Sequence, residues 1–162
     1  MAQDFFLKLD GVTGESIKEG HKDEIEILAW SWGLSNSANL HVGAGGGGTG
    51  KAAIQDISFT KYLDKTSPTI VQQCATGKHY ATAFLYCRKT GGDSPIDYLI
   101  FEFTDVIVSS VSTGGSGGED GLTENITLNF AKFKMTYATQ TKEGGKGAPV
   151  EFGFDISTGA KV

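Results

Sequence analysis

The segment most suggestive of chemistry is glycine-rich and reads Gly45-Gly-Gly-Gly-Thr-Gly50-Lys51. It matches the first seven positions of a phosphate-binding loop, in which backbone amides and a lysine hold phosphate oxygens. The eighth position, where a serine or threonine hydroxyl should bind Mg²⁺, is Ala52. A strand-like alternation of Ile54, Asp56 and Ser58 then follows where the motif needs a helix. We interpret the segment as a loop tip and not as a nucleotide site.

Histidines give no pattern of a metal or catalytic site. His21, His41 and His79 share no spacing that would place two of them on one helix face. We expect isolated histidines that lie on the surface or are partly buried, and we interpret Asp23 and Glu24 as ordinary surface neighbours of His21.

The cysteines and serines, which could act as nucleophiles, also show no catalytic pattern. Cys74 and Cys87 are thirteen positions apart, and without a C-x-x-C arrangement we expect two small buried apolar residues, although one bridge is possible. Ser109, Ser110 and Ser112 lack the G-x-S-x-G context of an exposed nucleophile. The sequence therefore predicts no enzyme, no cofactor and no metal site.

Charge and hydropathy exclude two further classes. The 162 residues hold 14 Lys and Arg against 19 Asp and Glu, a net charge of −5, with no basic cluster that could neutralise phosphates. We therefore predict no nucleic-acid partner. The first ten residues lack the basic start and apolar run of a signal peptide, and no apolar stretch approaches the roughly 20 residues of a membrane span. We expect one domain over residues 1–162, made in the cytoplasm without a cleavable leader and not inserted in a membrane.

Most of the 23 glycines fall in four loops, and the segments between those loops are typical of strands. The predicted strands are Phe5–Leu9, Glu24–Trp32, Ile54–Tyr62, Tyr80–Lys89, Asp97–Val108, Glu124–Tyr137 and Val150–Ile156. In the long strand Glu124–Tyr137 the apolar positions change parity after Phe130, and Asp97–Val108 changes parity before Val106. Because side chains alternate with a period of two, such strands must bulge or change the face that they bury. The pattern predicts an all-β chain with a closed or nearly closed barrel.

One helix interrupts the strands. Ser67 stands at the expected N-cap, Pro68 at the first helical position and Gly77 at the left-handed C-terminal position. Apolar residues at positions 70, 71, 74 and 75 form one stripe between them. We expect this helix to pack across one end or side of the barrel.

A second glycine-rich loop, Gly114–Gly121, joins the two longest predicted strands and contains the adjacent acids Glu119 and Asp120. Such a tip projects from a small barrel and suits contact with a neighbouring subunit. The candidate contact residues are Gly114, Gly115, Ser116, Gly117, Gly118, Glu119 and Asp120.

The stretch Val108–Phe130, which contains this loop, resembles the signature of the haemolysin-coregulated protein (Hcp) family. The segments Ile27-Leu-Ala-Trp-Ser-Trp-Gly33, Ser58-Phe-Thr-Lys-Tyr62 and Gly77-Lys-His-Tyr80 follow the order and spacing of that family. The resemblance covers nearly the whole chain and is weakest from Thr139 onward.

The resemblance implies a structural, non-enzymatic tube protein of the bacterial type VI secretion system. The implied fold is a β-barrel of two packed sheets with one flanking helix, similar to that of phage tail tubes. The implied partners are copies of the same chain in hexameric rings that stack into a hollow tube, a contractile sheath, a spike protein of the VgrG type, and small effector proteins in the lumen. Export without a cleavable leader agrees with this interpretation.

Three residue-level expectations follow. In the strand Glu24–Trp32 we expect Trp30 and Trp32 to be buried and Ser31 to lie on a wetter face, the lumen. We expect the loop Gly114–Gly121 to contact an adjacent ring or subunit. For the other glycine-rich loop the candidate stacking residues are Gly45, Gly46, Gly47 and Gly48. The alternatives are a small-molecule-binding β-barrel and a nucleotide-binding enzyme.

Overall fold

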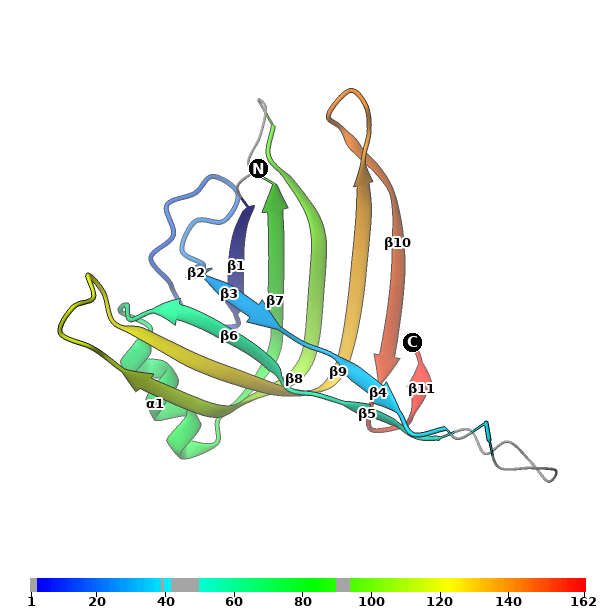
Figure 1. Ribbon diagram of the computed structural model, residues 1–162, viewed down its shortest axis with the longest axis horizontal. Coiled ribbons are helices and arrows are strands. Elements are labelled where there is room, and N and C mark those ends of the chain that lie inside the picture. Colours follow the sequence, from blue (N-terminus) through cyan, green and yellow to red (C-terminus); the bar gives the residue numbers. More distant parts are fainter. Residues whose placement is uncertain (1–2, 39, 42–49, 90–93) are drawn as a thin grey trace.

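The computed structural model describes residues 3–38, 40–41, 50–89 and 94–162, and it shows a β-barrel with one helix packed beside it (Figure 1). The elements in chain order are β1 (Gln3–Leu9), β2 (Ile25–Ile27), β3 (Ala29–Ser31), β4 (Leu34–Asn36), β5 (Ala52–Ile54), β6 (Ile57–Tyr62), α1 (Ser67–Thr76), β7 (His79–Lys89), β8 (Ile96–Gly114), β9 (Thr123–Gln140), β10 (Lys146–Asp155) and β11 (Ala160–Lys161). The predicted all-β class with one short helix is confirmed.

The strand ladder closes on itself. Antiparallel pairing runs from β1 through β7, β8, β9 and β6 to β3. Strand β2 directly precedes β3 and pairs back with β1, which completes the circuit. Strands β10 and β11 extend the sheet beyond β9, and β4 and β5 form a separate two-stranded ribbon. The predicted strand Glu24–Trp32 is thus two short strands with a break at Leu28, where the chain turns from one side of the barrel to the other.

The long strands β8 and β9 bend together and belong to both sides of the barrel (Figure 1). The first part of β9 pairs with β6, whereas its second part pairs with β10. The buried residues change parity at this bend, from Phe101 and Phe103 to Val106 in β8 and from Phe130 to Phe133 in β9. Between the two halves of β8, Asp105 has a φ of 55°, in the left-handed region that non-glycine residues rarely adopt. The predicted change of buried face is confirmed.

Aromatic side chains fill the barrel interior. Phe59, Phe101 and Phe103 are almost fully buried. Trp30 and Trp32 lie edge-on against Phe101, with ring centroids 5.4 and 5.6 Å away. Both tryptophans are half-buried and pack on the core. The interior is a packed core, because side chains of every strand in the circuit meet there.

Helix α1 matches its predicted range, but its N-cap differs from the prediction. Thr66 is the N-cap and Ser67 is already helical, because the Ser67 hydroxyl bonds to a buried ion pair instead of capping the helix. At the other end Gly77 adopts the expected left-handed conformation with a φ of 67°, and its N–H donates to the Gln73 carbonyl. Of the described residues, none forms a helix long and apolar enough to cross a membrane.

Candidate functional site

Strands β3, β6, β9 and β8 lie side by side and present small hydroxyl and amide side chains on their outward face. The strand register aligns Ser31 with Ser58, Ser58 with Thr127, and Thr127 with Ser110. A second row runs in the same way from Thr60 to Asn125 and then to Ser112. We call this surface the hydroxyl face, and it consists of Ser31, Ser58, Thr60, Ser110, Ser112, Asn125 and Thr127.

Hydrogen bonds between strands hold the hydroxyl face in one arrangement. The Thr60 hydroxyl donates to Asn125 Oδ1 at 2.7 Å, and the hydroxyls of Ser110 and Thr127 lie 2.6 Å apart. Ser31 is exposed, as the sequence predicts. The face offers donors and acceptors without formal charge, so it can bind polar groups weakly and without selecting one sign of charge.

A carboxylate lies at the margin of the hydroxyl face, on Asp56 just before β6. Its two oxygens accept hydrogen bonds from the Ser109 hydroxyl at 2.7 Å and from Asn129 Nδ2 at 2.8 Å. Ser109 is the residue at the β8 bulge, where the register with β9 shifts. Asp56 therefore fixes the bulge by bonding across to both long strands.

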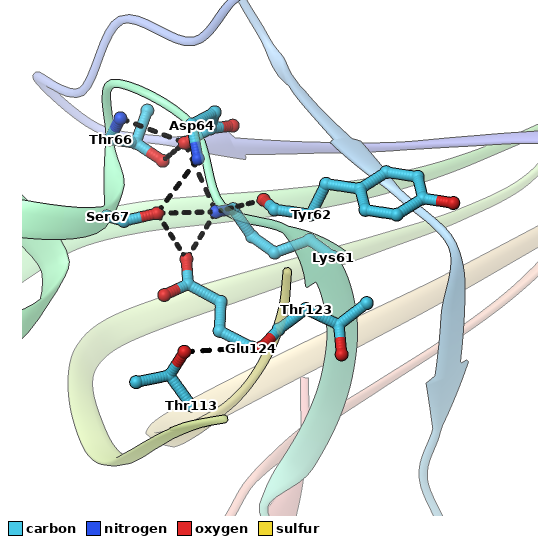
Figure 2. Close-up of polar contacts among 8 residues, drawn as sticks. All are labelled: Lys61, Tyr62, Asp64, Thr66, Ser67, Thr113, Thr123 and Glu124. Atoms are coloured by element: carbon cyan, nitrogen blue, oxygen red, sulfur yellow. Dashed lines mark hydrogen bonds and ion pairs between the residues drawn. The ribbon is translucent and has the colours of Figure 1, made fainter. Parts of the chain in front are cut away.

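The inward face of the same strands holds a buried ion pair (Figure 2). Lys61 is paired in register with Glu124, and both side chains point away from the hydroxyl face into the barrel, where their exposed fractions are 0% and 1%. The Lys61 ammonium donates to Glu124 Oε1, to the Tyr62 carbonyl at 2.9 Å and to Asp64 Oδ1 at 3.1 Å. The Ser67 hydroxyl donates to the same Glu124 oxygen at 2.7 Å.

This ion pair connects β6, β9 and the start of α1. Every partner of the Lys61 ammonium in Figure 2 is a charged or carbonyl oxygen or a hydroxyl, so the buried charge is well compensated. Sequence reasoning missed the pair, although a signal was present. Lys61 shares the parity of Ile57 and Phe59, and Glu124 shares that of Ile126 and Leu128, so both charges occupy core positions of their strands.

The loop between β8 and β9 lies at the far end of this hairpin (Figure 1). Its residues from Gly115 to Asp120 are exposed, and a turn closes where the Glu119 N–H donates to the Ser116 carbonyl at 3.2 Å. Just before β9 begins, the Leu122 carbonyl accepts a hydrogen bond from the Leu63 N–H at 2.9 Å. This bond connects the loop to the segment after β6. The expected subunit contact of this loop remains a prediction.

The other glycine-rich candidates, Gly45, Gly46, Gly47 and Gly48, lie outside the described residues. The segment that follows them is described, and Ala52–Ile54 forms strand β5, as expected for a loop tip and unlike a phosphate-binding loop. The predicted small buried cysteines are both free thiols. Cys87 is buried, and burial raises its pKa to about 12, whereas Cys74 is only half-buried.

The interpretation of Glu24 as a surface neighbour of His21 is wrong. Both residues are buried, with exposed fractions of 8% and 4%, and His21 Nδ1 bonds to Glu24 Oε2. The other ring nitrogen lies 2.8 Å from an Asp97 oxygen, which is 76 residues away in sequence. Spacing along the chain could not show this, because the fold brings Asp97 to the loop from another strand.

Comparisons with known proteins agree with the fold. A family model described as "Type VI secretion system effector, Hcp" matches residues 6–137. "Protein hcp1" of Pseudomonas aeruginosa is 54% identical over 157 residues, 96% of either chain. A solved structure described as that of a type six secretion system protein superposes with a TM-score of 0.93 at 32% identity, over 99% of this chain and 100% of that one. Hcp1 from Salmonella typhimurium superposes with a TM-score of 0.82 at 37% identity over the full length of both chains.

Proposed function

We propose, from the premise that this chain belongs to the Hcp family of type VI secretion system proteins, that it is the inner-tube subunit of such a system. Six copies form a ring, and rings stack into a hollow tube. A contractile sheath drives the tube outward behind a spike protein of the VgrG type. Small effector proteins travel in the lumen, and the chain leaves the cytoplasm with the tube.

The observation that carries this proposal is the hydroxyl face. In a closed cyclic ring every subunit turns the same face toward the axis. A curved sheet with small uncharged polar groups suits the wall of a channel, because cargo can be held by many weak hydrogen bonds and still be released. The chain has a net charge of −5, so a ring concentrates six times that charge, but no residue of the hydroxyl face carries a formal charge.

An exposed apolar surface on β9 and β10 supports self-association. The core face of the sheet continues beyond the barrel in two rows, from Phe101 to Met135 and Phe152 and from Leu99 to Tyr137 and Val150. Exposure rises along the second row, to 43% for Tyr137 and 73% for Val150. Contiguous apolar side chains of this kind mark interaction surfaces. We expect a neighbouring copy in the ring to cover them.

Thiol labelling at Ser31 tests the proposed lumen. In a Cys74→Ser background we would introduce Ser31→Cys, and separately Ile17→Cys as a control on an outer loop where Ile17 is 88% exposed. In assembled tubes a small maleimide should reach both positions, whereas a maleimide on a polymer too wide for the channel should label only Ile17→Cys. Equal labelling of both positions by the wide reagent in intact tubes would contradict the assignment of the hydroxyl face to the lumen.

A further inference from the structure

His21 lies in the connection between β1 and β2, residues 10–24, and its ring is buried between two aromatic rings from the barrel. The imidazole stacks on Phe6 of β1 with centroids 4.3 Å apart and an interplanar angle of 7°. On β7, Tyr86 contacts it with centroids 4.9 Å apart. His21 thus packs on two side chains that are register partners on neighbouring strands, and it anchors the loop to both strands.

Both nitrogens of the His21 ring face carboxylates. Nδ1 bonds to Glu24 Oε2, and Nε2 lies 2.8 and 3.0 Å from the two oxygens of Asp97. A neutral imidazole has one N–H and could donate to only one of these carboxylates. Its other nitrogen would direct a lone pair at a carboxylate oxygen unless that carboxyl carried a proton. The geometry therefore requires one proton more than a neutral imidazole and two carboxylates carry together.

The charged and titratable groups around this cluster come from every element packed against it. They are Glu24 of the loop, Asp4 and Lys8 of β1, Glu26 of β2, Tyr86 and Arg88 of β7, and Asp97 and Glu102 of β8. Arg88 supports the loop separately, because its Nη1 donates to the Glu19 carbonyl at 2.8 Å.

We propose that His21 is a proton-dependent latch, which holds loop 10–24 against the barrel while the cluster keeps its proton and releases the loop when that proton is lost to solvent. Burial raises the pKa of Glu24, with the His21 imidazole opposing this shift, so the low-dielectric surroundings resist a second bare carboxylate beside the ring. Because the docked state binds the extra proton, docking is strongest at low pH and weakens as pH rises.

The loop also has anchors away from His21, because the Asp10 N–H donates to the Thr82 carbonyl at 3.2 Å and Val12 packs against the core. Its described backbone hydrogen bonds near His21 are internal, among them Gly14 N–H to the Asp23 carbonyl at 2.6 Å and Asp23 N–H to the Ser16 carbonyl at 2.8 Å. The loop also forms one wall of a cleft of about 420 Å³, to which it contributes Glu15, Ser16 and Lys18. The opposite walls come from the strands β1 and β2 and from the segment Tyr62–Asp64. Release of the latch therefore opens this cleft.

Hydrogen exchange measured by mass spectrometry on the full chain tests the latch. The readout is the protection factor of residues 11–23 between about pH 6 and about pH 9, normalised to the exchange rate of an unstructured peptide at each pH. We expect protection to fall at least tenfold over this range, because loss of one proton can change the docking equilibrium by up to about tenfold per pH unit. The control variant His79→Gln, at an exposed histidine on β7, should behave as the parent chain.

In the variant His21→Gln, protection should be low at every pH. Should that variant fail to fold, Asp97→Asn tests the same point, because Asp97 is 30% exposed and the asparagine Nδ2 can donate to an unprotonated Nε2. The ring then needs no extra proton, so protection of the loop should no longer fall over this pH range. Protection that stays constant with pH in the parent chain, or a release that occurs at the same pH in parent and Asp97→Asn, would overturn the proposal. Neither result bears on the tube function.

Discussion

Replacing Glu124 by alanine would leave the Lys61 ammonium inside the barrel without its main carboxylate. Lys61 is fully buried, and the remaining acceptors are the Tyr62 carbonyl, Asp64 and the Ser67 hydroxyl. Removing one partner of a buried ion pair typically costs about 3–5 kcal/mol, because the other charge remains desolvated. A domain of this kind has a total stability of about 5–15 kcal/mol, so the loss is a large fraction of it.

The measurement is the free energy of unfolding from urea titration, at one protein concentration for all variants. For a chain of this length a loss of 3–5 kcal/mol corresponds to a melting temperature lower by about 6–20 °C. The matched control is Lys134→Ala, which breaks an ion pair with Glu151 at 3.2 Å in which both side chains are 47% exposed. Such a surface pair contributes about 0–1 kcal/mol.

A double variant separates the cost of an unpaired charge from the value of the pair itself. In Lys61→Met with Glu124→Leu both charges are replaced by apolar side chains of similar length. We expect most of the stability lost in Glu124→Ala to return, because the buried ammonium is gone and Asp64, which is 13% exposed, still accepts a hydrogen bond from the Thr66 N–H. The reasoning is refuted if Glu124→Ala costs no more than Lys134→Ala, or if the double variant is no more stable than the single one.

Four further predictions concern the loops and the thiols. Deletion of Gly117–Asp120 should reduce the mass of the assembled particle in light scattering while the circular dichroism of the chain stays unchanged; full assembly would refute the contact role of this loop. Cys74 should react with a soluble disulfide reagent at about pH 8, and Cys87 should react only in denaturant. Burial raises the pKa of Cys87 to about 12 and excludes the reagent. Rapid reaction of two thiols in the native chain would contradict this. Since the Cys87 thiol ionises more readily in the unfolded chain, its contribution to stability is complete below its ordinary pKa and falls as pH rises toward 12, which urea titrations at alkaline pH can follow. Gly14→Ala should destabilise loop 10–24, because a Cβ there would lie 2.2 Å from the Glu24 carbonyl oxygen, and a melting temperature equal to that of the parent would be inconsistent with this packing.

The local patterns of the sequence predicted most of the fold. Side-chain alternation located the long strands, and the parity change between Phe130 and Phe133 indicated the bend that carries β9 from one side of the barrel to the other. Proline and glycine at the ends of α1 bounded the helix correctly. These features depend on neighbours within a few residues, so a single sequence is sufficient to show them.

Contacts between distant segments could not be read in this way. Asp97 reaches His21 only because β7 pairs with both β1 and β8, and no spacing rule connects two residues 76 positions apart. The Lys61–Glu124 pair depends on the register between β6 and β9, which the fold determines. The hydroxyl face is an intermediate case. Each strand showed alternating polar residues, but their alignment into rows required the pairing of all four strands.

The central claim, that this chain is the subunit of a hexameric tube, is tested most directly by the mass of the purified protein in solution. Light scattering combined with negative-stain images gives both the copy number and the shape of the particle. The account predicts ring-shaped particles of about 103 kDa, six times the chain mass of 17.2 kDa, or integral stacks of such rings. A monomer of 17.2 kDa that persists at all micromolar concentrations, without rings in the images, would contradict it.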